Sequence, residues 1–438
     1  MKVFMIVIDS LRYDMATNHM LLFSRLKALS NTLTFEKAFS PGTSTPFAFP
    51  GLLASEYSFV GNTSGILETP ITLAEVMKEK GFETYGNAGN NAHLSNVRGY
   101  HRGFDVYSPI FPSAQKSKNT KREKLKKVLK DLRVFDLART SITRLKQYRD
   151  ILKLMFKNTP KVYPFERTFE EIKDFLRPDK KQFVFLNIMD VHGPYFGLLS
   201  MNILEILKYN KFVKIKYLEE DIDILRSWRD YYLSLYTKAV ENIGKLLEEM
   251  FNFLDMEGYL KDSIVVLTSD HGEEFLEHGG FDHRPKPFEE IIHVPLLVYV
   301  GWETFSPGDK ENARNRLISL IDIPQSLVTY LFKKPRKEFM GFNTIFGNEK
   351  REYIYAEGWR KKDKPYHDPS KKGFHNYAFR TKEWKYMVLD GKECFYDLAS
   401  DPLEKKCSCV NENIRNVVED YKKELKKQTL VHKIANLF

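Results

Sequence analysis

The chain has 438 residues, of which 42% are hydrophobic and 14% aromatic, and this composition excludes a disordered protein. Lys and Arg (68) outnumber Asp and Glu (58). The resulting net charge of +10 favours anionic partners, although no motif predicts specific nucleic-acid recognition. Three cysteines, Cys394, Cys407 and Cys409, are too few for a fold that depends on disulfides, and the Cys-x-Cys pair is a weak metal motif.

The amino-terminal residues are not typical of a signal peptide. The apolar run over residues 3–8 is too short for one and ends at Asp9. No apolar run approaches the roughly 18 residues of a membrane span. We therefore expect a cytoplasmic protein, with peripheral contact to a membrane as an addition.

Four short apolar runs predict buried strands, at residues 3–8, 183–188, 263–268 and 294–299. Helical patterns separate them, at 20–29, 46–55, 71–80, 167–177, 228–255 and 319–332. This alternation predicts an α/β fold, with a mostly parallel central sheet and helices on both faces. Ligands of such sheets bind beyond the carboxyl ends of the strands. Because Asp9, Asp190 and Asp270 follow three of the runs, we expect a site at that edge.

Two segments interrupt the alternation and are interpreted as insertions, at about 111–165 and 200–227. A lysine-rich stretch at 116–130 predicts either a solvated helix or a basic surface for anionic lipid or a polyanion. After about residue 350 short strands and turns follow, with strands at 380–388 and 394–397 and a helix at 411–427. We expect a catalytic α/β domain over 1–345 and a small α+β subdomain over 346–438.

A metal site is predicted where the run Thr268-Ser-Asp-His-Gly-Glu leaves a buried strand. The adjacent carboxylate and imidazole of Asp270 and His271 suit Mn or Zn, whereas a site with more oxygen ligands favours Mg or Ca. Asp9, at the end of the first strand, is well placed to add a carboxylate. The alternative for these residues is helix capping.

A nucleophile is predicted at Thr45, which precedes Pro46 and reads as the N-cap of a helix. A hydroxyl there faces backbone N–H groups and the positive end of the helix dipole, which favour a phosphate or sulfate. Metal binding would lower its pKa and make it a nucleophile. Four histidines lie in loops just after strands, where an imidazole can hold an ester oxygen or protonate a leaving group. They are His192, His271, His278 and His283.

These residues resemble the sulfatase-like branch of the alkaline phosphatase superfamily. The segments that carry the resemblance are VFMIVIDSLRYD, SPGTSTPFAFPGLLAS, GNNAHLSNVRGYHRGFDVY, LNIMDVHGPY, VVLTSDHGEEFLEHGG and RTKEWKYMV with FYDLASDPLE. By position, the resemblance implies metal ligands at Asp9, Asp270 and His271, and Thr45 as nucleophile and further ligand. It implies that His192 and His283 face substrate oxygens. The remaining candidates for substrate contact are Asn91, Arg284 and His278.

The sequence departs from the type sulfatases at the nucleophile. Those enzymes use a formylglycine made from Cys or Ser in a C/S-x-P-x-R setting, and Thr45 cannot yield one. Ser44 satisfies the x-Pro part and is the reserve nucleophile. Ser10 stands where many one-metal sulfatases have a second Asp, and His271 where they often have Asn. These differences favour phosphoryl chemistry. Because a complete second-metal set is not evident, we expect one divalent ion, with Mn or Zn favoured.

We therefore expect a metal-dependent hydrolase of phosphate or sulfate esters, such as a phosphodiesterase, that uses a threonine nucleophile. The alternative among enzymes is a transferase that moves a phospho-headgroup onto a glycan or lipid. The alternative from another class is a non-catalytic anion-binding protein on the same fold.

Overall fold

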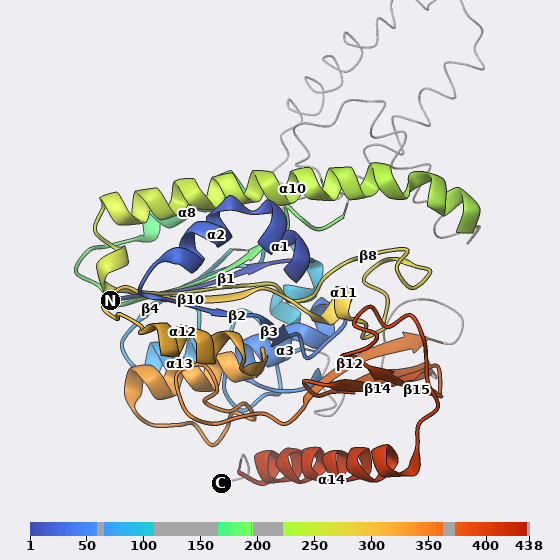
Figure 1. Cartoon of the computed structure of the whole chain (residues 1–438). Helices are drawn as coiled ribbons and strands as arrows, with labels where there is room; N and C mark the ends of the chain where they lie inside the picture. Colours follow the sequence, from blue (N-terminus) through green and yellow to red (C-terminus); the bar gives the residue numbers. More distant parts are fainter. Residues whose placement is uncertain (59–64, 109–164, 194, 196–221, 362–372, 436–438) are drawn as a thin grey trace, which may run out of the picture.

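A seven-stranded sheet forms the centre of the molecule, in the order β2-β10-β7-β1-β6-β4-β5 (Figure 1). The computed structural model describes residues 1–58, 65–108, 165–193, 195, 222–361 and 373–435. The middle strand β1 (Lys2–Ile8) runs parallel to β6 (Gln182–Ile188) and β7 (Ser263–Thr268). All three are buried along their whole length, which explains why their sequences are continuous apolar runs.

The outer strands complete the sheet and include one reversal of direction. They are β2 (Thr32–Phe35), β4 (Glu83–Asn87), β5 (Val106–Ser108) and β10 (Leu296–Val300). β10 is antiparallel to both β7 and β2. The predicted α/β fold with a mostly parallel sheet is confirmed, and the fourth apolar run is the strand that breaks the parallel pattern.

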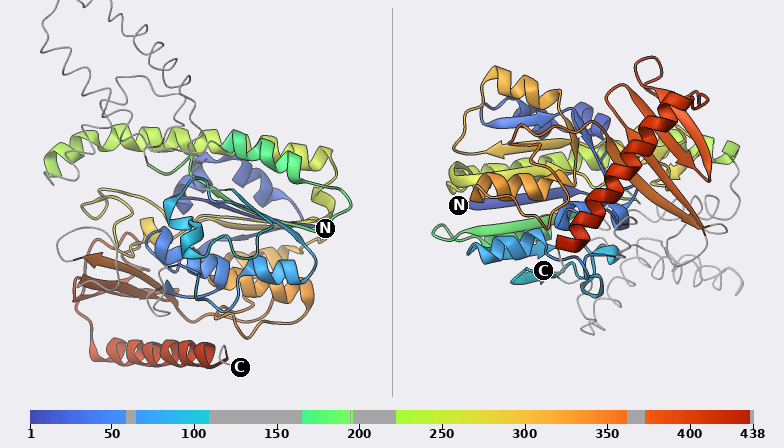
Figure 2. Two further views of the ribbon diagram at one scale, coloured as in Figure 1. Left: turned by 180° about the vertical axis from the view of Figure 1, so that it is seen from behind. Right: turned by 90° about the horizontal axis from the view of Figure 1, so that it is seen from below.

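Helices cover both faces of the sheet (Figures 1 and 2). Even-numbered residues of β1 pack toward one helical layer and odd-numbered residues toward the other, as the period of a strand requires. The first layer holds α1 (Tyr13–His19), α2 (Leu21–Ala28), α8 (Phe165–Phe175) and the long α10 (Ile222–Met256). The second holds α3 (Thr45–Ala54), α5 (Leu73–Glu79), α12 (Pro307–Arg314) and α13 (Asp322–Phe332).

Short elements border the carboxyl ends of the strands. β3 (Lys37–Phe39) pairs with β11 (Leu317–Ser319), and β8 (Glu274–Phe275) with β9 (Phe281–Asp282). A 3-10 turn at Leu260–Asp262 precedes β7 at the opposite edge of the sheet. The remaining short elements at the carboxyl edge are the single-turn helix α11 (Glu289–Ile292) and 3-10 turns at Ala92–Leu94 and Asn96–Arg98. These elements position the loops of the candidate site.

The carboxyl-terminal residues form a four-stranded antiparallel sheet (Figure 1). Its strands are β12 (Ile354–Lys361), β13 (Gly373–Arg380), β14 (Trp384–Leu389) and β15 (Lys392–Asp397), and α14 (Glu412–Ala435) covers one face. The strand predicted at 380–388 is wrong in one respect, because a turn at 381–383 separates β13 from β14. The terminal helix is longer than predicted. The domain boundary at 345–346 stays a prediction.

Cys394 and Cys407 form a disulfide that links β15 to the segment before α14, whereas Cys409 is free and exposed. The cysteine count gave no indication of this bond. It encloses the turn that carries Glu404 and Lys405, two residues that contact the central domain.

Several sequence predictions lie outside the described residues. These are the lysine-rich stretch at 116–130 and most of the insertions at 111–165 and 200–227, although α10 already begins at Ile222. Within the described ranges, no helix combines the length and the apolarity needed to cross a bilayer.

Candidate functional site

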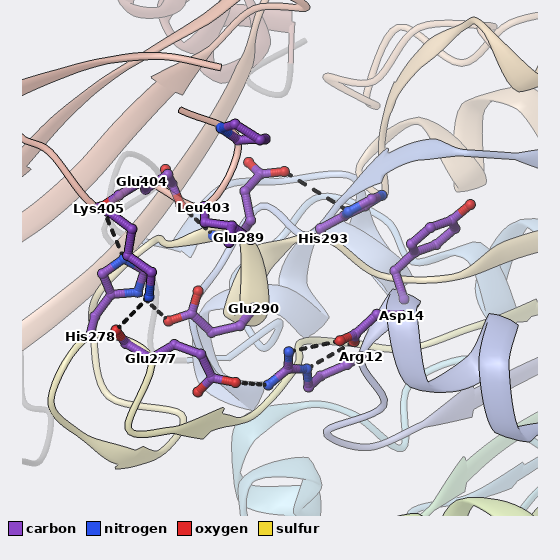
Figure 3. A pocket seen from close by; sticks show the side chains of 12 residues that line it. Arg12, Asp14, Glu277, His278, Glu289, Glu290, His293, Leu403, Glu404 and Lys405 are labelled. Atoms are coloured by element: carbon purple, nitrogen blue, oxygen red, sulfur yellow. Dashed lines mark hydrogen bonds and ion pairs between the residues drawn. The ribbon is translucent and has the colours of Figure 1, made fainter. Parts of the chain in front are cut away.

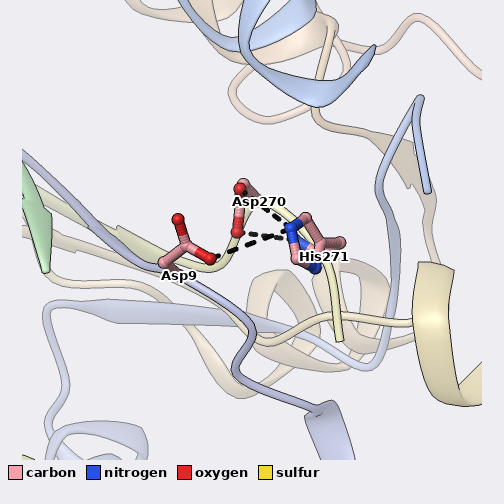
Figure 4. A group of neighbouring side chains, drawn as sticks. All are labelled: Asp9, Asp270 and His271. Atoms are coloured by element: carbon pink, nitrogen blue, oxygen red, sulfur yellow. Dashed lines mark hydrogen bonds and ion pairs between the residues drawn. The ribbon is translucent and has the colours of Figure 1, made fainter. Parts of the chain in front are cut away.

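Three buried ligand groups meet where β1 and β7 end side by side (Figure 4). Asp9 follows β1, and Asp270 and His271 follow β7. One ligand atom from each residue lies within 4.8 Å of the other two, and none of the three side chains reaches solvent. The parallel register produces this meeting, because it brings the carboxyl ends of two adjacent strands to one edge.

Ser10 ties the two carboxylates together from an unusual backbone position. Its φ of 65° lies in the left-handed region, which few residues other than glycine adopt. In this conformation its N–H donates to Asp270 Oδ1 (3.2 Å), while its hydroxyl donates to Asp9 Oδ1 (3.1 Å). The carbonyl oxygen of Ser10 accepts from Tyr236 Oη (2.6 Å) on α10. Strain of this kind persists where the surrounding contacts over-determine it.

Thr45 faces the carboxylates from the first residue of α3. Its hydroxyl donates to Asp270 Oδ2 (3.0 Å) and lies 3.4 Å from Asp9 Oδ2. The predicted cap is displaced by one residue, since Ser44 is the N-cap and makes no capping bond through its side chain. Ser44 Oγ has no hydrogen-bond partner among the described residues, so the geometry joins Thr45 to the carboxylates rather than Ser44.

The charges of the site depend on one another. Burial would raise the pKa of Asp9, but nearby imidazole groups, that of His192 first, lower it. Burial and the charge of Asp9 hold the pKa of Asp270 well above its usual value. Burial lowers the pKa of His271, which therefore stays neutral and able to bind a metal.

The donor set fits a divalent cation. The carboxylates of Asp9 and Asp270 lie close together. His271 Nε2 lies 3.3 Å from Asp270 Oδ2 and accepts no hydrogen bond from a described residue. Its other nitrogen, Nδ1, lies 2.9 Å from the carbonyl oxygen of Gly272, which fixes the tautomer. Asp9, Asp270 and His271 would hold the ion, and their mixed oxygen and nitrogen set is one that Mn or Zn accepts.

Two further histidines border this group. The ring centroid of His283 lies 4.3 Å from that of His271 and 5.3 Å from that of His192. Asp9 and Glu273 raise the pKa of His192, although burial opposes them. His283 Nδ1 lies 3.5 Å from Glu273 Oε1, and that carboxylate is 1% exposed. The sequence reasoning missed Glu273, although it ends the same motif that supplies Asp270 and His271.

Asn91 also contacts the centre. Its Nδ2 donates to Asp9 Oδ2 (2.9 Å) and lies 3.3 Å from Thr45 Oγ1. His93, which the sequence reasoning also missed, follows on the same turn; burial and the charge of Arg98 lower its pKa to about 4. Arg284 is half-buried beside His283, and no described residue forms a hydrogen bond or ion pair with its guanidinium. It remains available for an anion.

Two residues expected at the site have their own partners elsewhere. His278 lines a polar cavity of about 400 Å³ between the central domain and the carboxyl-terminal segment (Figure 3). Its Nδ1 lies 2.6 Å from Glu290 Oε1 and its Nε2 3.1 Å from Glu404 O, so both ring nitrogens are engaged. Asp190 interacts with the backbone of Phe165, and burial raises its pKa to about 7. The structure therefore does not bring His278 or Asp190 to Thr45.

Fold and site together define an α/β protein of the alkaline phosphatase superfamily, with a candidate metal group at the carboxyl edge of its sheet. The model of the Sulfatase family matches residues 2–331. The chain belongs to the sulfatase family, which confirms the resemblance found in the sequence.

Curated relatives match part of the chain. It is 29% identical over 213 residues to arylsulfatase K of Bos taurus, a match that covers 45% of this chain and 35% of that protein. It is also 29% identical over 184 residues to the N-acetylglucosamine-6-O-sulfatase of Bacteroides thetaiotaomicron, covering 40% of this chain and 30% of the relative. The chain thus spans about a third of the length of these relatives.

Solved structures share the fold over nearly the whole chain. The phosphonate monoester hydrolase of Agrobacterium radiobacter superposes with a TM-score of 0.63 at 18% identity, covering 98% of this chain and 96% of its own. A protein in complex with its substrate D-glucosamine-2-N,6-O-disulfate gives a TM-score of 0.64 at 13% identity and covers 98% of both chains. At such identities the likeness concerns the fold.

Proposed function

We propose that this protein is a metal-dependent hydrolase of phosphate or sulfate esters in which Thr45 is the nucleophile. The observation that carries the proposal is the position of Thr45 Oγ1, 3.0 Å from Asp270 Oδ2 and at the start of α3. A nucleophile in this place lies among the candidate metal ligands and faces the end of a helix that favours an anion.

In the proposed reaction the protein's own groups bind the ester, attack it and protonate the leaving alcohol. Asn91 and Arg284 bind the ester oxygens. Thr45 gives its hydroxyl proton to Asp270 Oδ2, to which it already donates. Its Oγ1 forms a bond to phosphorus or sulfur while the bond to the alcohol oxygen breaks, and that alcohol takes a proton from His192 or His283. Water then cleaves the threonine ester and restores the hydroxyl. A bound divalent cation would supply Lewis acidity toward the ester and a lower pKa at Thr45.

We propose phosphoryl esters as the preferred substrates, because a threonine cannot become formylglycine. The curated relatives are named as sulfatases, whereas a similar fold belongs to a phosphonate monoester hydrolase. A screen of phosphomonoesters, phosphodiesters, phosphonates and sulfate esters with Mn, Zn, Mg and Ca separates these classes. An added alcohol acceptor in the same screen detects a transferase.

The deciding variants are Thr45→Ala and Ser44→Ala. We expect Thr45→Ala to abolish turnover, with a loss on the order of 10⁴-fold or more, because the attacking oxygen is gone. Rapid quenching of the native protein with a phosphoester should give a modified threonine at position 45 by peptide mass spectrometry. Full activity of Thr45→Ala, or modification at Ser44, would overturn the assignment. Turnover of no ester under any metal would favour the non-catalytic alternative.

The cytoplasmic location remains our proposal, and the Cys394–Cys407 disulfide is the observation that weighs against it. Disulfides persist mainly in oxidising compartments. Rapid alkylation of intact cells measures the state of these cysteines: reduced thiols support the cytoplasm, and a protected pair contradicts it.

A further inference from the structure

One face of the carboxyl-terminal sheet points toward the candidate site. Strand register puts alternate residues on this face, because Gly358 pairs with Asn376, Ala378 with Met387, and Arg380 with Lys385. The opposite face carries Tyr355, Phe379 and Tyr386 and packs with α14. We call the first the docking face; it comprises Ile354, Ala356, Gly358, Asn376, Ala378, Arg380, Lys385 and Met387.

The docking face holds the loop that carries His283. Asn376 Nδ2 donates to the carbonyl oxygen of Pro285 (2.8 Å), two residues after His283. Lys385 Nζ, which is wholly buried, donates to Pro287 O (3.1 Å) and pairs with Glu289 (2.8 Å). Residues 285, 287 and 289 thus bind successive positions on this sheet, Pro285 at Asn376 and the other two at Lys385. The His283 loop, residues 281–289, is thus bonded at several points to a separate sheet.

The edge strand of this sheet, β12, holds the loop that carries Thr45. The main chain of Glu357 exchanges two hydrogen bonds with this loop: Glu357 N–H donates to Pro41 O (3.0 Å), and Thr43 N–H donates to Glu357 O (3.0 Å). The neighbouring Gly358 lies between the two loops. A Cβ at Gly358 would overlap Thr43 Oγ1 and lie 3.0 Å from Pro285 Cβ.

We propose that the docking face sets the separation between the Thr45 loop (residues 40–45) and the His283 loop, and that Asn376 and Gly358 are positioning residues for the reaction. Neither touches the reacting atoms; each acts through a loop that does. The inference rests on the proposed function for its kinetic consequence. Its structural part, a shared support for two loops from distant parts of the sequence, does not.

The geometry explains why glycine stands at position 358 and asparagine at position 376. Only a glycine at 358 lets the backbone of β12 reach both Thr43 and Pro285. Asn376 joins two segments, since its Oδ1 also accepts from Asp390 N–H (2.8 Å) while its Nδ2 holds Pro285. A nucleophile and a proton donor must be held within fractions of an ångström, and a displacement of about 1 Å costs on the order of 100-fold in rate.

Asn376→Asp is the sharpest variant. It keeps the acceptor for Asp390 and replaces the donor to Pro285 with a carboxylate oxygen that faces a carbonyl oxygen. We expect kcat to fall about 10-fold to 100-fold with KM changed less than about twofold. The loss should be larger for alkyl esters than for nitrophenyl esters, because a displaced His283 matters most when the leaving alcohol needs a proton.

Gly358→Ala tests the second residue and offers a rescue. The added methyl group would displace both loops and lower kcat in the same way. Thr43→Ala in the same chain removes the overlapping hydroxyl, which has no hydrogen-bond partner among the described residues. The double variant should therefore recover part of the lost kcat, because the close approach to Pro285 remains.

Val418→Ala is the matched control. Val418 is buried between α14 and the opposite face of the same sheet, so its truncation destabilises the subdomain without touching either loop. We expect a fall in Tm like that of Asn376→Asp, with kcat within about twofold of the native value. Equal losses of kcat in the two variants would overturn the proposal, because the docking face would then contribute stability alone.

Hydrogen–deuterium exchange tests whether the docking face supports the two loops, and it does not depend on enzyme activity. Amides of residues 281–289 and 40–45 should exchange faster in Asn376→Asp and Gly358→Ala, and at the native rate in Val418→Ala. Unchanged amide exchange in Asn376→Asp and Gly358→Ala would contradict the proposal that one sheet supports both loops. If the native protein hydrolyses no ester, the proposed function fails, and the exchange measurement still tests the docking face.

Discussion

At the scale of single residues, the centre of the site is a pair of carboxylates that share partners. Asp9 and Asp270 both lie within reach of the Thr45 hydroxyl, and both accept from Ser10. The charge of Asp9 contributes to the raised pKa of Asp270, so the arrangement is costly without a cation. The two carboxylates therefore suit a bound cation, and without one their repulsion lowers the stability of the fold.

Metal binding should appear as stabilisation that Asp270→Asn removes. At a concentration of about 100 times the dissociation constant, a cation adds about 2.7 kcal/mol to the free energy of unfolding. We expect Mn or Zn to raise the Tm of the native protein and leave that of Asp270→Asn unchanged. In a chelator the variant should be as stable as the native protein or more so, because the carboxylates no longer repel each other. An equal metal-induced shift in both proteins would contradict the assignment of Asp270 as a ligand.

Glu273 should act through His283. Its carboxylate lies 3.5 Å from His283 Nδ1 in a buried position, so it can orient the ring. We expect Glu273→Gln to lower kcat about tenfold or more with little change in KM, because the ring of His283 is less firmly oriented. Steady-state kinetics from pH 5 to pH 9 provide the measurement. A change confined to KM would show that Glu273 serves substrate binding instead.

At the scale of elements, the turn between β8 and β9 is tied to α11 by a charged contact. Burial would lower the pKa of His278, but the hydrogen bond and charge of Glu290 raise it above its ordinary value. A raised pKa in the folded state means that this contact stabilises fully below about pH 6.5. The contribution is lost as the pH rises through the folded-state pKa. The His278–Glu290 contact therefore stabilises the fold under neutral and mildly acidic conditions.

His278→Asn tests this contact, because Asn retains hydrogen bonding and loses the charge. We expect the native protein to exceed the variant in Tm by the largest margin near pH 6, and by a smaller margin at pH 9. Thermal unfolding across that range gives the comparison. A margin that does not change with pH would mean that His278 contributes packing against Phe288 rather than charge.

The elements show what the sequence could reveal. Apolar runs and helical periods predicted the central strands and the helices on both faces, because burial dictates those patterns. An apolar run carries no sign of direction, so the antiparallel course of β10 could not be predicted. The N-cap was predicted at Thr45 and lies one residue earlier, at Ser44, because the sequence offers two successive hydroxyl residues before Pro46.

The candidate site was predicted in part. Asp9, Asp270, His271 and Thr45 could be named because strand ends and a helix start place them without knowledge of the rest of the fold. In the sequence both His278 and His283 were candidates for the site. The structure distinguishes them, because His278 binds Glu290 and Glu404 instead. The docking face was not foreseeable, since it joins residues 41–43 and 285–289 to strands more than 60 residues away from either.

At the scale of the whole molecule, a single covalent bond closes the turn that contacts the central domain. The Cys394–Cys407 bond spans 13 residues and encloses Glu404. A loop of this size is expected to contribute about 3 kcal/mol through the entropy of the unfolded chain. We expect Cys394→Ser with Cys407→Ser to lower stability by about that amount in denaturant titrations. Reductant should destabilise the native protein and leave the double variant unaffected; equal sensitivity would contradict a role for the bond.

The central place of β1 has a consequence for how the protein is made. Residues 2–8 are synthesised well before their partners, which are residues 182–188 and 263–268. Contacts so distant in sequence form slowly, and a nascent chain exposes the apolar strand until most of its length has been synthesised. The cation site cannot close before residue 271 exists. Metal capture would therefore require synthesis past residue 271, and a fragment that ends before residue 263 would have neither the site nor β7 beside β1.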